Sequence, residues 1–232
     1  MTRTSKIRMN TKNKKIAGVG IAILILALGL IVVFSQNLAS TSGDSKLARV
    51  ACLGDSITEL TGYPEDLQKL MGNASVVCNF GFSGSTVIFD STEPYFFEHE
   101  FKNAKAFGPT TVIIMLGTND AHPDVYSSIS DFVPNYEIMI RSIQAISSKP
   151  QIFLVEPPPI FNNTLGVNID SYVQGVIPRI QEVANQTGVH LIDVYTPLLN
   201  HPEYFTDGLH PNSDGAKIIA NIIYKAITSN SS

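Results

Sequence analysis

The chain lacks tryptophan and has only two cysteines among its 232 residues. Two cysteines exclude a disulfide-rich scaffold, and no metal-site spacing of Cys and His occurs. Basic residues are scarce beyond the N-terminus, because residues 36–232 hold ten Lys and Arg against 20 Asp and Glu. This part of the chain therefore has a formal charge of −10, which argues against a nucleic-acid partner. The overall composition, 44% hydrophobic and 16% charged, is typical of a globular protein.

The N-terminal region combines a basic segment that lacks acidic residues with a long apolar run. Residues 1–15 hold six basic side chains, and residues 16–34 read IAGVGIAILILALGLIVVF. This uncharged run approaches the roughly 20 residues that a helix needs to cross a bilayer. A cleaved signal peptide has a shorter apolar core, about 7–15 residues, followed by a cleavage site of the small-x-small type. Residues 35–40 contain no clear cleavage site of that type.

The pattern favours an uncleaved transmembrane anchor at residues 16–34, with secretion after signal cleavage as the alternative. Residues 1–15 then form a basic cytoplasmic tail, because basic flanks stay on the cytoplasmic side. Residues 35–46 are rich in Ser, Thr, Gly and Asn and predict a flexible stalk. Residues 47–230 form a domain on the extracellular, periplasmic or lumenal side.

Short β-rich runs alternate with helical patterns along this domain, which predicts a single α/β sandwich around a parallel sheet. The runs are apolar on both faces, as parallel strands covered by helices are. We expect His190 to pack in the core on the fifth strand. Cys52 and Cys78 are expected as buried thiols on neighbouring strands, with a disulfide as the alternative. The predicted strands are residues 49–53, 75–80, 111–116, 151–155 and 189–194, and the predicted helices are residues 64–71, 134–147, 172–186 and 213–226.

Four polar segments follow predicted strands. Because ligands of such sheets bind beyond the carboxyl ends of the strands, these segments are expected to meet. A serine is a poor nucleophile unless a base takes its proton and a third group orients that base. The segments contain all three side-chain types. They read Gly-Asp-Ser at 54–56, Asn-Phe-Gly-Phe-Ser-Gly at 79–84, Gly-Thr-Asn-Asp at 117–120 and Asp-Gly-Leu-His at 207–210.

These four segments resemble the sequence blocks of the SGNH (GDSL-type) hydrolases, and the resemblance covers residues 49–228. It implies a flavodoxin-like three-layer α/β/α fold with sheet order 2-1-3-4-5, and hydrolysis of acyl esters without a cofactor or metal. By this resemblance Ser56 is the nucleophile, His210 the base and Asp207 its partner. The oxyanion donors would be the backbone N–H groups of Ser56 and Gly84 and the side-chain amide of Asn119.

Simpler roles are also open to residues in and near these segments. Ser56 could cap the helix that follows it, and Asn119 could form a turn. Asp55 is expected to bind nearby backbone, and Asp120 to be a turn former. His122 closely follows the third segment. A solvated loop is its simpler expectation, and a place in the cleft is the alternative.

The segment pattern is also similar to exported bacterial members that act as carbohydrate or sialate O-acetylesterases. The loops at residues 90–97 and 161–168 are polar and aromatic, without a long apolar lid for an acyl chain. We therefore expect a serine esterase that hydrolyses short-chain acetyl esters, on a carbohydrate, through an acyl-enzyme on Ser56. The alternatives are a lysophospholipase- or thioesterase-like acyl hydrolase at the membrane surface and a non-catalytic glycan-binding domain. The oligomeric state stays open.

Overall fold

The computed structural model describes residues 47–229, and these form one five-stranded parallel sheet with helices on both faces. The strand order is β2-β1-β3-β4-β5. The predicted α/β sandwich is confirmed, and so is the strand order that the family resemblance implied. The strands are β1 (Ala48–Gly54), β2 (Ser75–Gly81), β3 (Thr111–Met115), β4 (Gln151–Glu156) and β5 (His190–Asp193).

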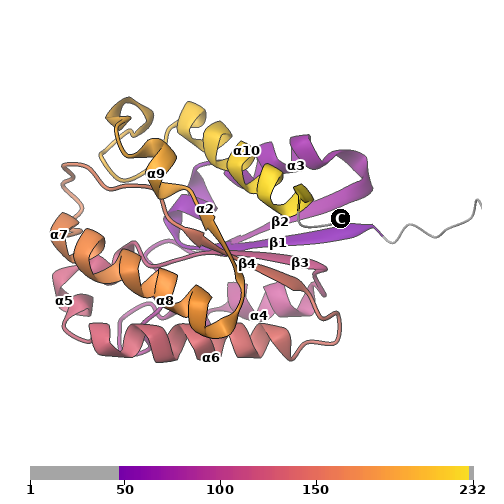
Figure 1. Ribbon diagram of the computed structural model, residues 1–232, viewed down its shortest axis with the longest axis horizontal. Coiled ribbons are helices and arrows are strands. Elements are labelled where there is room, and N and C mark those ends of the chain that lie inside the picture. The colour runs from indigo at the N-terminus through magenta and orange to yellow at the C-terminus, as the bar shows by residue number, and fades with distance from the viewer. Residues whose placement is uncertain (1–46, 230–232) are drawn as a thin grey trace, which may run out of the picture. The chain divides into compact units, whose positions relative to one another are not determined.

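The helices form two layers, one on each side of the sheet (Figure 1). One layer contains α3 (Tyr63–Met71) and α10 (Ser213–Ser229), which pack against each other. The opposite layer contains α4 (His99–Ala106), α6 (Phe132–Gln144) and α8 (Ile177–Thr187). Short α-helices are α2 (Ser56–Leu60), α5 (Pro123–Tyr126), α7 (Ile169–Ser171) and α9 (Tyr195–Leu198). A π-helical turn, η5, covers Tyr172–Val176, and 3-10 turns cover η1 (Gly72–Ala74), η2 (Tyr95–Phe97), η3 (Asn119–Ala121), η4 (Ile129–Asp131) and η6 (Pro202–Tyr204).

The core lies between the sheet and these two helix layers. The central strands β1, β3 and β4 are buried over most of their length. Helix α6 buries Tyr136, Met139, Ile140 and Ile143, the face that an apolar repeat of three and four residues predicts. The sheet is therefore rigidly supported on both sides, and its carboxyl edge is a fixed platform for the loops that follow each strand.

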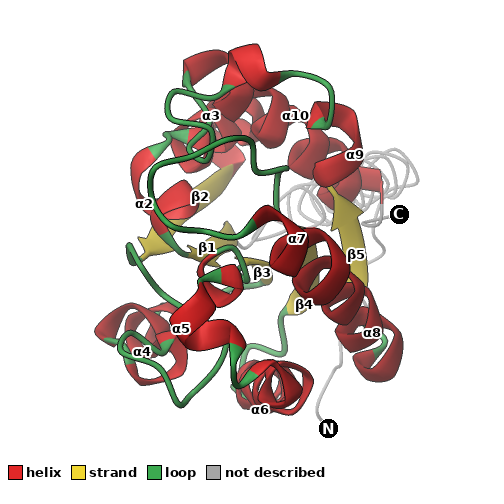
Figure 2. Cartoon of the chain, turned by 90° about the vertical axis from the view of Figure 1, so that its left-hand side faces the viewer, coloured by secondary structure: helices red, strands yellow, loops and turns green. Residues whose placement is uncertain are grey.

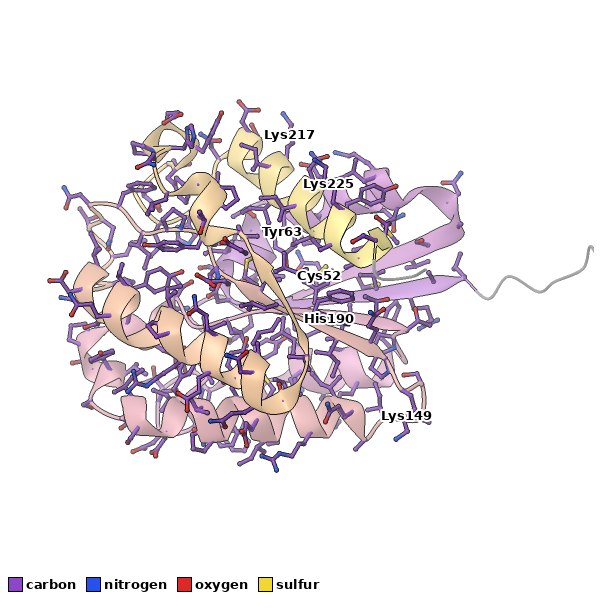
Figure 3. All side chains as sticks on the ribbon, viewed as in Figure 1. Cys52, Tyr63, Lys149, His190, Lys217 and Lys225 are labelled. Carbon is purple, nitrogen blue, oxygen red and sulfur yellow. The ribbon has the colours of Figure 1, made fainter. Side chains whose placement is uncertain are left out.

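Two expectations about individual side chains need correction. The expectation that His190 packs in the core is wrong, because His190 (labelled in Figure 3) lies on the edge strand β5 and is exposed. The next residue of β5, Leu191, is exposed as well. Its ring stacks on Phe153 at a centroid distance of 5.2 Å. Cys52 and Cys78 are free thiols, the first buried and the second only half-buried. Cys78 is in register with Ala51, so the side chains of Cys52 and Cys78 point to opposite faces of the sheet.

The predicted basic tail (1–15), anchor (16–34) and stalk (35–46) lie outside the described residues. Among residues 47–229, no helix has both the length and the apolar character of a membrane span.

Candidate active site

The loops that follow β1, β2 and β3 begin side by side at the carboxyl edge of the sheet. Gly54 is in register with Gly81 on one side and with Met115 on the other. The backbone N–H of Phe82 also donates to the carbonyl oxygen of Gly54 at 2.9 Å. Figure 2 views the molecule onto this edge, where α2, α5 and α7 lie near the strand ends. The first three predicted segments therefore meet, as parallel topology requires.

Ser56 is the first residue of α2, directly after β1, and its side chain is nearly buried. Asp55 precedes it as the N-cap, and its carboxylate accepts from the backbone N–H of Ile57 at 2.9 Å. The expected structural role of Asp55 is thus confirmed, and Ser56 itself does not cap the helix. Burial raises the pKa of Asp55 to about 6. The N–H of Ser56 belongs to the first helical turn, where no intrahelical acceptor exists, so it is available to a ligand.

Ser56, His210 and Asp207 form a continuous chain of hydrogen bonds. Nε2 of His210 lies 2.8 Å from Oγ of Ser56, across 154 residues of sequence. Nδ1 of His210 lies 2.8 Å from Oδ2 of Asp207. Partial burial raises the pKa of Asp207, but hydrogen bonds from the backbone and ring of His210 outweigh it and hold the pKa below its ordinary value. An ionised carboxylate at this position holds the imidazole so that its Nε2 faces the hydroxyl of Ser56.

The turn that carries Asp207 and His210 has a defined backbone. Oδ1 of Asp207 accepts from the N–H groups of Leu209 and His210, at 3.0 and 2.7 Å. Gly208 adopts a left-handed conformation with φ of +82°, and a Cβ there would collide with the carbonyl oxygen of Asn162. Only glycine satisfies both conditions without strain. The 161–168 loop therefore presses on the turn and sets the position of the imidazole.

The two other predicted oxyanion donors lie together. Gly84 and Asn119 both line one cavity at the carboxyl edge. Gly84 is exposed with φ of +79°, and its N–H donates to no acceptor within residues 47–229. Nδ2 of Asn119 donates one hydrogen to the carbonyl oxygen of Ser85 at 2.9 Å, which leaves its second hydrogen for another acceptor. The structure thus brings Gly84 and Asn119 to one cavity. It joins Ser56, His210 and Asp207 in one hydrogen-bonded chain.

Asp120 has a larger role than the turn former that the sequence suggested. It does lie in the turn η3, but its side chain is fully buried. Its Oδ1 accepts from the backbone N–H groups of Val87 and Ile88, each at 3.0 Å. Burial raises the pKa of Asp120 to about 7, against the opposing effect of these two hydrogen bonds. Asn119 and Asp120 together hold the backbone of residues 85–88, the segment that directly follows Gly84.

The cavity beside Gly84 and Asn119 has a volume of about 560 Å³, and eight of the ten described residues that line it carry polar side chains. His122 lies in the loop between η3 and α5 with 40% of its side chain exposed, as expected, and it is also part of this lining, the alternative that the sequence left open. Its Nδ1 lies 3.7 Å from Oδ2 of Asp124, and a Cβ on Gly166 would lie 3.0 Å from its Nε2. The remaining lining residues are Thr86, Asp90, Ser91, Thr92, Glu93 and Val125.

Comparisons with known proteins agree with this fold. A relative from Xylanibacter ruminicola described as an acetylxylan esterase is 36% identical over 205 residues, which cover 77% of this chain and 43% of the relative. The chain thus spans less than half of that relative's length. A GDSL-like lipase from Bacteroides thetaiotaomicron superposes with a TM-score of 0.63 at 25% identity, covering 80% of this chain and 90% of that one. A lipase/acylhydrolase from Enterococcus faecalis gives a TM-score of 0.64 at 23% identity, covering 79% and 96%.

The sequence model of the GDSL-like lipase/acylhydrolase family matches residues 52–218. This match begins just before the Gly-Asp-Ser segment and extends past His210, so it includes all four polar segments. The chain therefore belongs to the GDSL-like lipase/acylhydrolase family, as the resemblance of its segments implied.

Proposed function

We propose that this protein hydrolyses acetyl esters of carbohydrates through an acyl-enzyme on Ser56. The observation that carries the proposal is the chain of two 2.8 Å hydrogen bonds from Ser56 through His210 to Asp207. That chain has the parts of a serine hydrolase triad in the required order. The acetylxylan esterase at 36% identity supports the choice of acyl group and substrate class.

In this mechanism His210 takes the proton of Ser56 as Oγ attacks the ester carbonyl carbon. Negative charge then develops on the carbonyl oxygen, where the N–H groups of Ser56 and Gly84 and the amide of Asn119 donate to it. Each such donor contributes about 3–4 kcal/mol to the transition state. His210 next gives its proton to the departing alcohol oxygen. A water molecule, deprotonated by the same imidazole, attacks the acyl-enzyme and releases the acid.

The cavity lining supports a sugar as the alcohol part of the ester. Hydroxyl, carboxylate, imidazole and amide groups line it, and Val125 is the single aliphatic side chain among its lining residues. A long acyl chain requires a predominantly apolar site. Sugar hydroxyl groups, in contrast, both donate to carboxylates and accept from hydroxyls. The polar side chains among these lining residues therefore favour a glycan ester over the lipid and thioester alternatives.

We also propose that residues 16–34 anchor the protein in a membrane, with residues 1–15 in the cytoplasm, residues 35–46 as a stalk and the catalytic domain outside. The uncharged run at 16–34 and its basic flank support this arrangement. Cell fractionation with mass analysis of the intact protein tests it. Recovery of the full-length chain in the membrane fraction is expected, and a soluble chain that starts after residue 34 would instead show secretion after cleavage.

The activity is tested with full-length protein in non-ionic detergent. We expect the highest kcat/KM in a p-nitrophenyl series at acetate, with falling rates for butyrate, octanoate and palmitate. Acetate should also be released from acetylated xylooligosaccharides, and Ser56→Ala should abolish both reactions. A maximum at octanoate or palmitate would assign the enzyme to lipid or thioester substrates. Glycan affinity without turnover of any ester would assign it as a binding domain.

A further inference from the structure

Among the residues that the structure describes, the cavity beside Gly84 and Asn119 is lined by three carboxylates and by no Lys or Arg. The carboxylates belong to Asp90, Glu93 and Asp124. Glu93 lies beside Gly84, since a Cβ on Gly84 would lie 3.9 Å from Cγ of Glu93. Its backbone is fixed there, because its carbonyl oxygen accepts from the N–H of Thr86 at 2.9 Å. The negative charge of Glu93 is therefore held beside Gly84, one of the proposed oxyanion donors.

Two of these three carboxylates have no cationic partner among the residues that the structure describes. Within residues 47–229, the carboxylates of Asp90 and Glu93 take part in no hydrogen bond or ion pair. In the third carboxylate, Oδ2 of Asp124 lies 3.7 Å from Nδ1 of His122. Lysines lie elsewhere on the molecule. Lys149, for example, lies near the end of the sheet where the strands begin, opposite the edge with α5 and α7 (Figures 1 and 3).

Other basic residues are engaged away from the cavity. Lys69 and Lys217 pair with Asp66 and Asp214. The Arg49 guanidinium lies over the ring of Phe107, 4.0 Å from its centroid. The cavity therefore presents carboxylate oxygens, which accept hydrogen bonds from sugar hydroxyls but repel another carboxylate.

We propose that Asp90, Glu93 and Asp124 restrict the alcohol part of the substrate to uncharged sugars and reject sugars that carry a carboxylate. The proposal rests on the proposed carbohydrate esterase function and adds the charge class of the sugar. It sets this chain apart from esterases of sialic acids, whose sugar carries a carboxylate. Like charges at contact distance in a partly solvated cleft change binding by about tenfold or more.

The test compares two acetylated xylooligosaccharides that differ in one uronic acid branch next to the acetylated sugar. Acetate release by full-length protein gives kcat/KM for each at pH 8 and low salt. We expect the wild-type value to be at least about tenfold lower for the branched, anionic substrate. Added salt should narrow this gap, because ions screen exposed charges.

The variant Glu93→Gln removes one charge at nearly constant size and should raise the anionic-to-neutral ratio of kcat/KM at least about threefold. The triple variant with Asp90→Asn and Asp124→Asn should raise the ratio further. Glu182→Gln is the matched control, because Glu182 is exposed on α8 outside the cavity and the same charge is removed. This control should leave both rates and their ratio unchanged.

The outcomes separate the two proposals. Equal rates on both substrates with the wild type, or a ratio that the triple variant does not change, would overturn the charge selection while the esterase function stands. The charge selection would also be overturned if Glu182→Gln raised the anionic-to-neutral ratio of kcat/KM as much as Glu93→Gln does. The net charge of the domain, and not the cavity, would then be the cause. Failure to release acetate from either substrate would refute the proposed function itself, and the charge selection with it.

Discussion

Replacement of Asp120 by alanine should both destabilise the domain and slow catalysis. Its Oδ1 is the acceptor for the N–H groups of Val87 and Ile88, and all three residues are buried. An unsatisfied buried N–H costs about 1–3 kcal/mol, so losing both acceptor contacts should lower the free energy of unfolding by about 2–6 kcal/mol. This is a large share of the roughly 5–15 kcal/mol that stabilises a typical domain.

The loss should reach the active site through the chain between residues 84 and 88. Without its acceptor, this segment no longer fixes the N–H of Gly84, and the loss of one oxyanion donor lowers kcat about 10²–10³-fold. The matched control is Asp120→Asn, whose amide oxygen can still accept from both N–H groups. At pH 5, where a carboxyl with a pKa of about 7 is protonated, this variant should lose less than about 1 kcal/mol.

Urea unfolding followed by far-UV circular dichroism at pH 5 measures the stability, and p-nitrophenyl acetate turnover measures kcat. If Asp120→Ala unfolds at the wild-type urea concentration and keeps a normal kcat, then Asp120 does not position the loop. Equal losses of stability in the alanine and asparagine variants would show that the acid itself, rather than its acceptor oxygen, is required.

Three further predictions follow from the site. Asn119→Ala should lower kcat about 10²–10³-fold with little change in KM in steady-state assays, and a change confined to KM would assign Asn119 to substrate binding. Burial raises the pKa values of Asp55 and Asp120 to about 6 and about 7. The part of the free energy of unfolding that these two groups contribute at pH 4 should therefore be lost as the pH rises through those values. Urea unfolding at pH 4, 6 and 8 measures this loss, which Asp120→Asn should reduce, and equal stability at all three would contradict the raised pKa values. Gly208→Ala should lower both Tm and kcat, because φ of +82° and the contact with the 161–168 loop exclude a Cβ. Unchanged values would show that the catalytic turn tolerates a different backbone.

The sheet was predictable because its evidence is local in the sequence. The apolar runs of β1, β3 and β4 stand out, and three of the polar segments lie where β1, β2 and β3 end. Helix α4 was not predicted, since its sequence HEFKNAKA buries only Phe101 and Ala104 and has no strong apolar repeat. The predicted helix at 172–186 is instead a π-helical turn followed by α8. Pro178 lies at this junction and has no N–H to continue an α-helical pattern.

The parts of the site that were missed depend on contacts between distant segments. Asp120 binds backbone N–H groups 32 and 33 residues away, and an apolar pair such as Val87 and Ile88 gives no sign of a hydrogen-bonding role. The expectation for His190 was wrong although the order 2-1-3-4-5 implied that the fifth strand is an edge strand, because a strand sequence does not show which of its residues the neighbouring helices leave exposed. The charge of the cavity arises from the loop at residues 90–93 and from Asp124 on α5, which meet only in the folded chain.

The proposed reaction passes through a covalent acyl-enzyme at Ser56. The direct measurement mixes the full-length protein with p-nitrophenyl acetate, quenches it in acid within the first turnover and locates the acetyl group by peptide mass spectrometry. We expect one acetyl group on Ser56, formed together with a burst of p-nitrophenol, and no acetylation at that position in Ser56→Ala. Normal turnover by Ser56→Ala, or an acetyl group that forms and decays at the rate of turnover on another residue, would contradict it.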